Sequence, residues 1–516
     1  WRGLWRFLQY LGAKSLGPLL GTAIQDAARP FVTTKRPDTV STNTAMGQPD
    51  LFESSRGRSH ALTLEWDVSD SHSLKYIAAT RTVDVAESQD LDGMPLTSIE
   101  VIPGALSWGM SANNNRSTEY EQTSHELQWT ASFDAVNWVA GAYYFEDEGE
   151  TTGRQLFTLF GGAPQMVNYA ADTEAWALFT QADWNFAERW TATAGVRYTE
   201  EKRSGFSHRY STDVFGGDLV SDQGPGLLPF TTYGATFDDT TPMAALAFAV
   251  TDDLNLYARV ANGFKSGGFS SEVADPAVST PFEPQTSLSS ELGLKAEMLD
   301  GRARLNVAVF NNDISDLHIT QLLPGTTQSL VTNAGEATYR GLEVELALQM
   351  TENWRISGNY GYLDTEFDEY IDNSFAPGRP LIDTASNRLA PYAPENTASV
   401  QLVGTLLQLA LGDVQLMLDY SYTDKMYLYA VNKDLAAPNA GGSYVQGIDE
   451  VPSTQNLNAR LMLADVAVGS GTMDFSFFVR NLTDEDKHVQ MIDFSMFRNA
   501  SWQEPRSYVF TAAYNW

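Results

Sequence analysis

One unit recurs along most of this chain: an alternating strand, a short turn, a second alternating strand and then a long polar segment. Short turns lie at 251–253 and 299–301, whereas long segments lie at 82–118 and 201–240. A regular exchange of short and long connections is typical of an outer-membrane barrel, which has short periplasmic turns and long extracellular loops. About 17 strands are predicted from this pattern. They lie near 61–66 and 74–79, 120–131 and 136–146, 173–185 and 189–200, 241–250 and 254–264, 285–298 and 302–312, 335–349 and 354–364, 394–406 and 412–423, 454–466 and 472–481, and 505–516.

The side chains within each predicted strand alternate between two kinds of surface. In the strand 190–199, Trp190, Val196 and Tyr198 share one face, and Thr191 and Arg197 share the other. A barrel explains this pattern, because apolar residues face lipid and polar residues face the lumen. No uninterrupted apolar window of about 18 residues occurs, so helical membrane spans are excluded. We therefore predict an all-β, transmembrane, antiparallel up-and-down β-barrel with long extracellular loops and short periplasmic turns.

Charge and composition exclude several classes of protein. With 33 Lys and Arg against 65 Asp and Glu, the net charge is −32, which argues against a nucleic-acid partner. The chain has no Cys, so it has neither disulfides nor a Cys-ligated metal. Residues 1–58 are mixed and turn-rich, and we expect them to form a long loop. Residues 59–516 are the predicted barrel.

Several segments, taken in order, resemble the barrel of TonB-dependent outer-membrane receptors. The central match is Tyr257–Phe269, with the sequence YARVANGFKSGGF. The others are Phe282–Thr286, Glu291–Lys295, Asn333–Ala337, Arg340–Glu345, Asn481–Glu485 and the terminal strand from Glu504. Together they cover roughly 59–516. The resemblance departs at the last residue, which is Trp516 where the family usually has Phe.

This resemblance implies a 22-stranded barrel with a plugged lumen, of which this chain would hold about 17 strands, with the first strands and the plug missing. Residues 1–58 would then hold the end of a strand that begins outside this chain, followed by an extracellular loop. It also implies localisation in the outer membrane of a Gram-negative bacterium and uptake of a scarce nutrient, above all a ferric siderophore. The TonB complex would supply energy through the missing plug segment. The other partners it implies are outer-membrane lipid, lipopolysaccharide and the barrel-assembly machinery. Its assembly signal would be Tyr508, Phe510, Tyr514 and Trp516 in the closing strand.

The candidate ligand-binding residues are those on lumen or rim positions that suit an anionic iron chelate: Arg197, Tyr257, Arg259, Lys265 and Arg480. The alternative interpretation is that they pair with acidic groups of the lumen or the plug. No catalytic residue, cofactor or metal site is predicted, because the six His lack ligand spacing and no nucleophile motif occurs. The glycines at 263–268 are predicted to be bend or rim positions.

Two other protein classes remain open at this point. A passive porin-like channel would share the pattern of apolar and polar faces, although its loops are generally shorter. A soluble all-β binding protein would have to leave an aromatic-rich face exposed on many strands. The strand near 505–516 is expected to have one unpaired edge, so that the sheet is open or distorted between it and the N-terminal strands.

Overall fold

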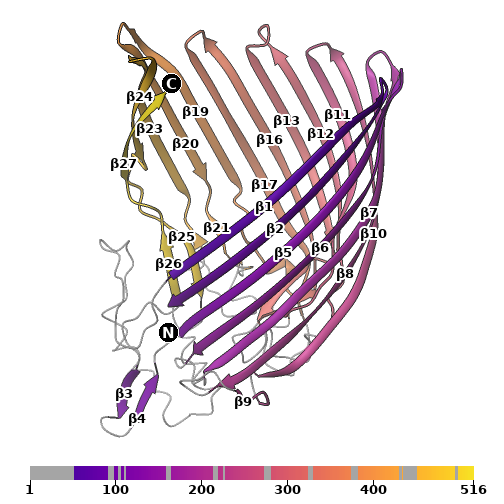
Figure 1. Cartoon of the computed structure of the whole chain (residues 1–516), viewed down its shortest axis with the longest axis vertical. Coiled ribbons are helices and arrows are strands. Elements are labelled where there is room, and N and C mark those ends of the chain that lie inside the picture. Colours follow the sequence, from indigo (N-terminus) through magenta and orange to yellow (C-terminus); the bar gives the residue numbers. More distant parts are fainter. Residues whose placement is uncertain are drawn as a thin grey trace.

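The structure is a single curved antiparallel wall of tilted strands (Figure 1). The computed structural model describes residues 52–90, 98–102, 106–109, 112–157, 164–212, 219–224, 227–271, 280–322, 329–372, 382–428, 430, 433, 450–493 and 498–516. The main sheet has 19 strands, and two of them, β9 and β18, are short side pieces; the other 17 form the wall. The wall strands are β1 (Phe52–Ser69), β2 (His72–Asp90), β5 (Ala112–Ser132), β6 (Val136–Phe157), β7 (Gln165–Ala187), β8 (Trp190–Thr212), β10 (Leu228–Thr251), β11 (Leu254–Lys265), β12 (Gln285–Met298), β13 (Ala303–Ser315), β16 (Gly335–Thr351), β17 (Trp354–Asp372), β19 (Asn396–Leu409), β20 (Gly412–Thr423), β23 (Thr454–Val468), β24 (Gly471–Arg480) and β27 (Ser507–Asn515).

Short elements lie at the end of the wall that carries the long connections. They are β3 (Ser98–Ile102), β4 (Leu106–Gly109), β9 (Leu219–Ser221), β14 (His318–Leu322), β15 (Ser329–Asn333), β18 (Ile382–Asp383), η4 (Ala385–Asn387), β21 (Met426–Tyr427), β22 (Glu450–Val451), β25 (His488–Asp493) and β26 (Arg498–Trp502). We call this end the mouth; the opposite end carries the short turns. Within the described residues, no helix is long and apolar enough to cross a bilayer.

Each wall strand pairs with the next along the chain, which confirms the predicted up-and-down order. The β7–β8 hairpin, for example, runs in register from Gln165 opposite Ser211 to Asn185 opposite Thr191, and the register shifts beside the turn, where Ala187 is opposite Trp190. The predicted turn at 299–301 is also present. There Leu299, Asp300 and Gly301 have positive φ angles of 57°, 56° and 79°, which reverse the chain tightly between β12 and β13.

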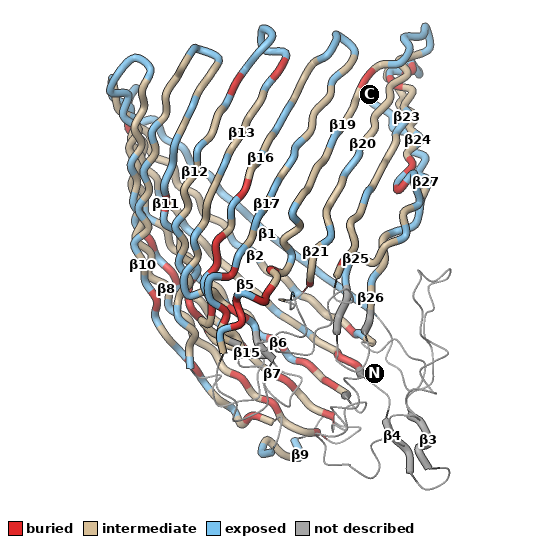
Figure 2. The backbone as a smooth tube through the Cα atoms, turned by 180° about the vertical axis from the view of Figure 1, so that it is seen from behind, coloured by how far each residue is buried: buried red, intermediate tan, exposed pale blue. Residues whose placement is uncertain are grey.

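The two faces of the wall have the predicted composition. Outward positions carry large apolar side chains that remain exposed, such as Leu178 at 55% and Leu292 at 65%. Their neighbours in sequence, Phe179 and Glu291, are on the inward face with Arg197 and Tyr257. Buried residues are sparse along the strands and gather toward the mouth (Figure 2). The fold therefore has a polar-lined interior in place of a solid apolar core.

The strands are longer at the mouth than the sequence pattern predicted. The segment 201–240 was expected to be a loop, but β8 continues to Thr212 and β10 begins at Leu228. Likewise β2 continues to Asp90, and β1 begins at Phe52, before the predicted boundary at 59. These extensions carry mostly polar residues, so they lack the apolar alternation. Their backbone ladders nevertheless continue, with a register shift between Leu228 and Thr231 in the β8–β10 pair. The other residues predicted as a loop, 1–51, lie outside the described residues.

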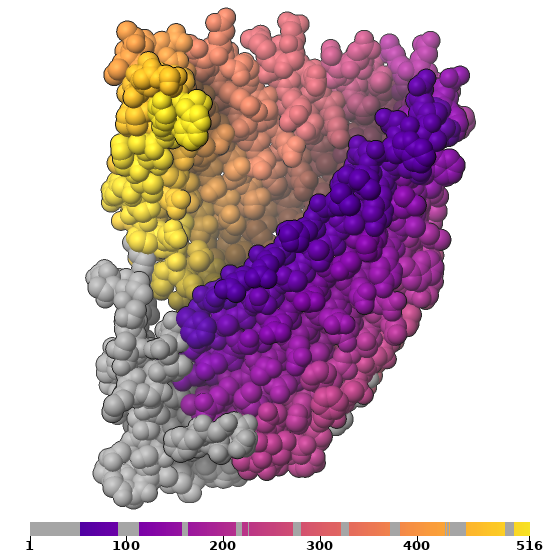
Figure 3. Space-filling model, viewed as in Figure 1, coloured from indigo at the N-terminus to yellow at the C-terminus, as the bar shows by residue number. Residues whose placement is uncertain are grey.

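The edges of the wall do not meet among the described residues. The recorded partner of β1 is β2, and that of β27 is β24. Figure 3 shows the resulting opening between the indigo edge of β1 and the yellow edge of β27. This agrees with the expectation that the closing strand has one unpaired edge.

Candidate functional site

The loop that follows β11 folds onto the inner face of β8 and β10 at the mouth. The ring of Phe269 stacks on Tyr233 with centroids 4.5 Å apart. The hydroxyl of Ser207 donates to the carbonyl of Ser271, and a Cβ at Gly267 would collide with the ring of Phe237. Gly267 is therefore a rim position that must be glycine for this close approach, as predicted for the run 263–268.

A second contact ties this loop to the hairpin of β14 and β15. The side-chain amide of Asn333 accepts from the backbone N–H of Glu283 at 2.7 Å and donates to its carbonyl at 2.7 Å. It also donates to the carbonyl of Asp316 at 3.0 Å. The side chain of Asn333 thus takes the place of a backbone pairing and holds together the loops that contain Glu283 and Asp316. This role was not apparent from the position of Asn333 in the Asn333–Ala337 motif.

His318 completes this junction. Its Nε2 lies 2.8 Å from the carbonyl of Glu283, and its ring meets Phe282 edge-on at 4.8 Å. Burial is the main cause that lowers the pKa of His318, and the nearby cations Lys265 and Arg203 lower that pKa further. The predicted residue Lys265 therefore lies in a cationic part of the mouth. Arg203 also belongs there, and sequence reasoning missed it although it continues the inward alternation of Arg197.

An apolar cluster supports the neighbouring part of the mouth. Its buried members come from β14, β16, β17, η4 and the segment after it: Ile319, Ala337, Phe367, Tyr370, Ala385 and Ala390. Arg388 is 4% exposed, lies 4.9 Å from the ring centre of Tyr370, and donates to the hydroxyl of Thr384 at 3.0 Å and to the carbonyl of Ala430 at 2.8 Å. Loops distant in sequence are thereby held together at the rim.

Arg197 lies on the inner face of β8, and its guanidinium is surrounded by wall residues. The guanidinium carbon is 5.5 Å from the ring centre of Tyr143 and 5.7 Å from that of Phe179. Its Nε donates to the hydroxyl of Thr199 at 3.0 Å. These contacts hold the guanidinium of Arg197 against two aromatic rings and a hydroxyl of the wall.

Tyr257 and Arg259 lie on the inner face of β11. The hydroxyl of Tyr257 donates to Glu291 Oε1 at 2.5 Å, and Lys295 Nζ lies 5.5 Å from its ring centre. Arg259 is directly opposite Glu291 in the β11–β12 register. This part of the lumen therefore combines acidic and basic groups on adjacent strands.

The five candidate residues do not form one cluster. Arg197 and Arg259 are separated by β10 alone, which pairs with both of their strands. Arg480, by contrast, lies at the end of β24, where its guanidinium carbon is 5.6 Å from the ring centre of Phe478 and Arg460 also approaches that ring. Their role in binding stays a prediction.

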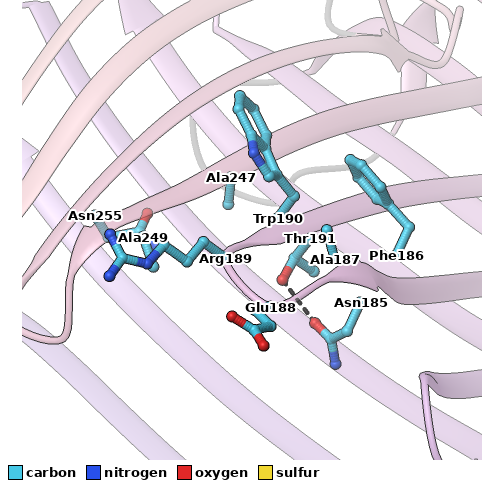
Figure 4. Close-up of a pocket in the computed structure, with 10 residues that line it drawn as sticks. All are labelled: Asn185, Phe186, Ala187, Glu188, Arg189, Trp190, Thr191, Ala247, Ala249 and Asn255. Atoms are coloured by element: carbon cyan, nitrogen blue, oxygen red, sulfur yellow. Dashed lines mark hydrogen bonds between the residues drawn. The ribbon is translucent and has the colours of Figure 1, made fainter.

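A polar hollow of about 500 Å³ lies at the opposite end of the wall, beside the turns of β7–β8 and β10–β11 (Figure 4). Arg189 donates to the carbonyl of Val250 at 2.8 Å, and Thr191 donates to Asn185 Oδ1 at 2.7 Å. These bonds secure the turns. Within the described ranges, no group of three or more His, Asp or Glu side chains could hold a metal ion.

The architecture has a counterpart among known protein families. A family model described as "TonB dependent receptor-like, beta-barrel" matches residues 4–482. The chain belongs to this family. TonB-dependent receptors are outer-membrane β-barrels of Gram-negative bacteria, and they are transporters.

Curated receptors are similar to this TonB-dependent receptor barrel over part of their length. A metal-pseudopaline receptor of Pseudomonas aeruginosa is 28% identical over 213 residues, which is 41% of this chain and 27% of that receptor. A pesticin receptor of Yersinia pestis is 27% identical over 196 residues, covering 38% of this chain and 26% of the relative. The matches thus span about a quarter of these relatives.

Solved structures show the same fold over most of the chain. The ferric yersiniabactin uptake receptor of Yersinia pestis superposes with a TM-score of 0.68 at 18% identity, covering 91% of this chain and 63% of that one. The siderophore receptor PiuA of Acinetobacter baumannii gives 0.66 at 18% identity, over 90% and 65%. At such identities the likeness shows the fold alone.

Proposed function

We propose that this TonB-dependent receptor barrel takes up a scarce nutrient across the outer membrane, specifically a ferric siderophore, with energy from the TonB complex. The observation that carries the proposal is the family match along nearly the whole chain. The names of the related receptors, which refer to metal-pseudopaline and to catecholate siderophores, support an iron-chelate ligand.

The mouth supplies physical support for an anionic ligand. Lys265 and Arg203 carry positive charge close to a rim built from inward-folded loops, and Arg203 is held there by an ion pair with Glu201. Ferric chelates are commonly anionic, and a guanidinium or ammonium held by a rigid rim would attract them. In this proposal Arg203 and Lys265 contact the ligand, whereas Arg197, Tyr257 and Arg480 stabilise the wall. Arg259 also stabilises the wall in this proposal, because it lies directly opposite Glu291 on the adjacent strand.

The closing strand supports the proposed assembly partner. Tyr508, Phe510 and Tyr514 are 62%, 69% and 41% exposed on the outer face of β27, and Trp516 follows at 96%. We infer that this aromatic row is the signal read by the barrel-assembly machinery, and that the same outer face contacts outer-membrane lipid and lipopolysaccharide.

Uptake of radioactive iron tests the proposal. The host is grown without iron, and its own secreted siderophores are loaded with the isotope and offered to the parent strain, a strain lacking this receptor and a strain lacking TonB. Uptake should be lost in both deletion strains, and the receptor gene should restore it in the strain that lacks the receptor. Unchanged uptake in the strain lacking the receptor would refute the siderophore assignment. Uptake that depends on the receptor but not on TonB would instead indicate passive conduction.

A further inference from the structure

A patch of aromatic side chains lies on the outer face of β8 and β10, beyond the level at which outward residues are apolar. Phe206 and Phe230 are stacked with centroids 4.9 Å apart. His208 lies 4.7 Å from Tyr210 and meets Phe230 edge-on at 6.1 Å. We call these four residues the outer aromatic platform. Phe230 is 60% exposed, so its ring presents a free apolar surface to the outside.

The boundary of the membrane can be located on the same strand. Trp176 and Tyr198 pack at 5.3 Å on the outer face, and the indole N–H of Trp176 donates to Glu200 at 3.2 Å. An aromatic pair with a carboxylate directly above it marks the edge of the apolar belt. Phe206 follows Tyr198 by eight residues on the same face of β8. At about 3.3 Å per residue and a strand tilt of about 40°, the platform lies roughly 20 Å further out.

The charges beneath the platform restrict what can bind it. Asp172, Glu174, Glu200 and Asp238 share this outer face, with Lys202 opposite Glu174. A predominantly acidic surface disfavours phosphate-bearing groups. An uncharged sugar suits the platform better, because one face of a hexose ring consists of C–H groups that pack flat on an aromatic ring.

We propose that the outer aromatic platform binds neutral hexoses of the outer core of lipopolysaccharide. The platform continues the lipid-facing wall outward, and at this height the surrounding molecules in the outer leaflet are the core sugars of that glycolipid. The proposal is independent of the nutrient that the receptor takes up. It depends on the outer-membrane location, which fractionation of the same cells checks separately.

Binding to two purified lipopolysaccharides tests this site. The receptor is isolated from outer membranes and titrated, by native mass spectrometry, with lipopolysaccharide that has a complete core and with a truncated form that keeps the inner core but lacks the hexoses. The unmodified protein should prefer the complete core. Phe230→Ala should reduce that preference about tenfold, as expected for the loss of one well-packed ring, whereas Phe230→Trp should keep it.

Phe133→Ala is the matched control, because Phe133 is 56% exposed at the short-turn end of the wall. It should leave the preference unchanged, and all variants should retain the mobility shift on heating that folded barrels show. Equal binding of the two glycolipids by the unmodified protein would overturn the proposal. So would an unaltered preference in a folded Phe230→Ala variant, or a protein partner occupying the platform in place of glycolipid.

Discussion

The ring of Tyr257 on β11 lies against Gly293 on β12, in the space that a side chain at position 293 would occupy. The two residues are directly opposite in the register, and a Cβ at 293 would collide with the phenol ring. The ring is held in place by the hydrogen bond from its hydroxyl to Glu291 at 2.5 Å. A glycine in one strand thus determines how a polar aromatic side chain lies along the lumen.

Gly293→Ala should therefore destabilise the barrel. Moving the ring breaks the bond to Glu291 or strains the strand, and overpacking of this kind costs about 1–3 kcal/mol. The temperature at which the heat-modifiable band is lost should fall. Gly57→Ala is the control, because nothing lies within 4 Å of a Cβ there, and it should be neutral or slightly stabilising. Equal effects of the two substitutions would contradict the proposed collision.

Two adjacent residues of β11 test the assignment of faces. Leu256 is on the outer face and 40% exposed, whereas Asn255 is on the inner face and lines the polar hollow. Leu256→Arg should impair assembly, since it puts a charge on the lipid face. The cost should be up to about 1 kcal/mol, because Leu256 is two residues into β11 from the short turn and so lies near the membrane interface. Asn255→Arg should be tolerated. The yield of heat-modifiable protein in outer membranes measures both, and similar yields would show that the faces are wrongly assigned.

The mouth should loosen in acid through His318. Burial lowers the pKa of His318 below its ordinary value of 6.5, so the folded protein keeps the imidazole neutral. The unfolded loop takes up a proton as pH falls below 6.5, and the folded loop resists it, so stability present above that pH is lost progressively below it. Lys265, Arg203 and Asp316 are the charged groups around it, and the two cations oppose protonation.

Hydrogen exchange of residues 282–285 measures this effect, and exchange should accelerate between neutral pH and pH 5 beyond its intrinsic pH dependence. His318→Gln should remove the excess acceleration, because the amide N–H₂ can still donate to the carbonyl of Glu283 without titrating. A variant that retained the full acceleration would exclude His318 as its source.

Asn481 should be required for placing the closing strand. Its side-chain amide donates to the carbonyls of Glu485 and Glu504, each at 3.0 Å, and it accepts from the N–H of Glu485 at 2.8 Å. It is 4% exposed and has a φ of 47°. Asn481→Ala leaves these backbone groups unpaired and strains the turn. The free energy of unfolding should therefore fall by at least about 2 kcal/mol.

Asn481→Gly separates the two causes, because glycine tolerates the positive φ but cannot restore the hydrogen bonds. We expect the yield of assembled protein for Asn481→Gly to lie between the yield of the unmodified chain and that of Asn481→Ala. If both variants assembled normally, the turn would have no part in positioning Glu504 and β27.

The wall itself could be predicted closely from the sequence. Two features depend on neighbouring residues alone: the alternation around Trp190 and Val196, and the turn at Leu299–Gly301. They can therefore be predicted from one strand at a time. The ends of the strands could not be predicted in this way. The β8 extension to Thr212 is polar on its inner face and mixes polar with aromatic residues on its outer face, so it lacks a regular apolar alternation. Only its pairing with β7 and β10 shows that it is a strand.

The amino-acid sequence alone determined the strand order, the apolar outer face and the polar lumen of this protein, because side-chain period and turn length are local properties. The tertiary structure decided which side chains meet at the mouth. Asn333 reaches Glu283, His318 lies near Lys265 and Arg203, and Phe206 stacks on Phe230. Such contacts depend on the way the long loops fold back and on the register between strands. Neither can be predicted from a local sequence pattern.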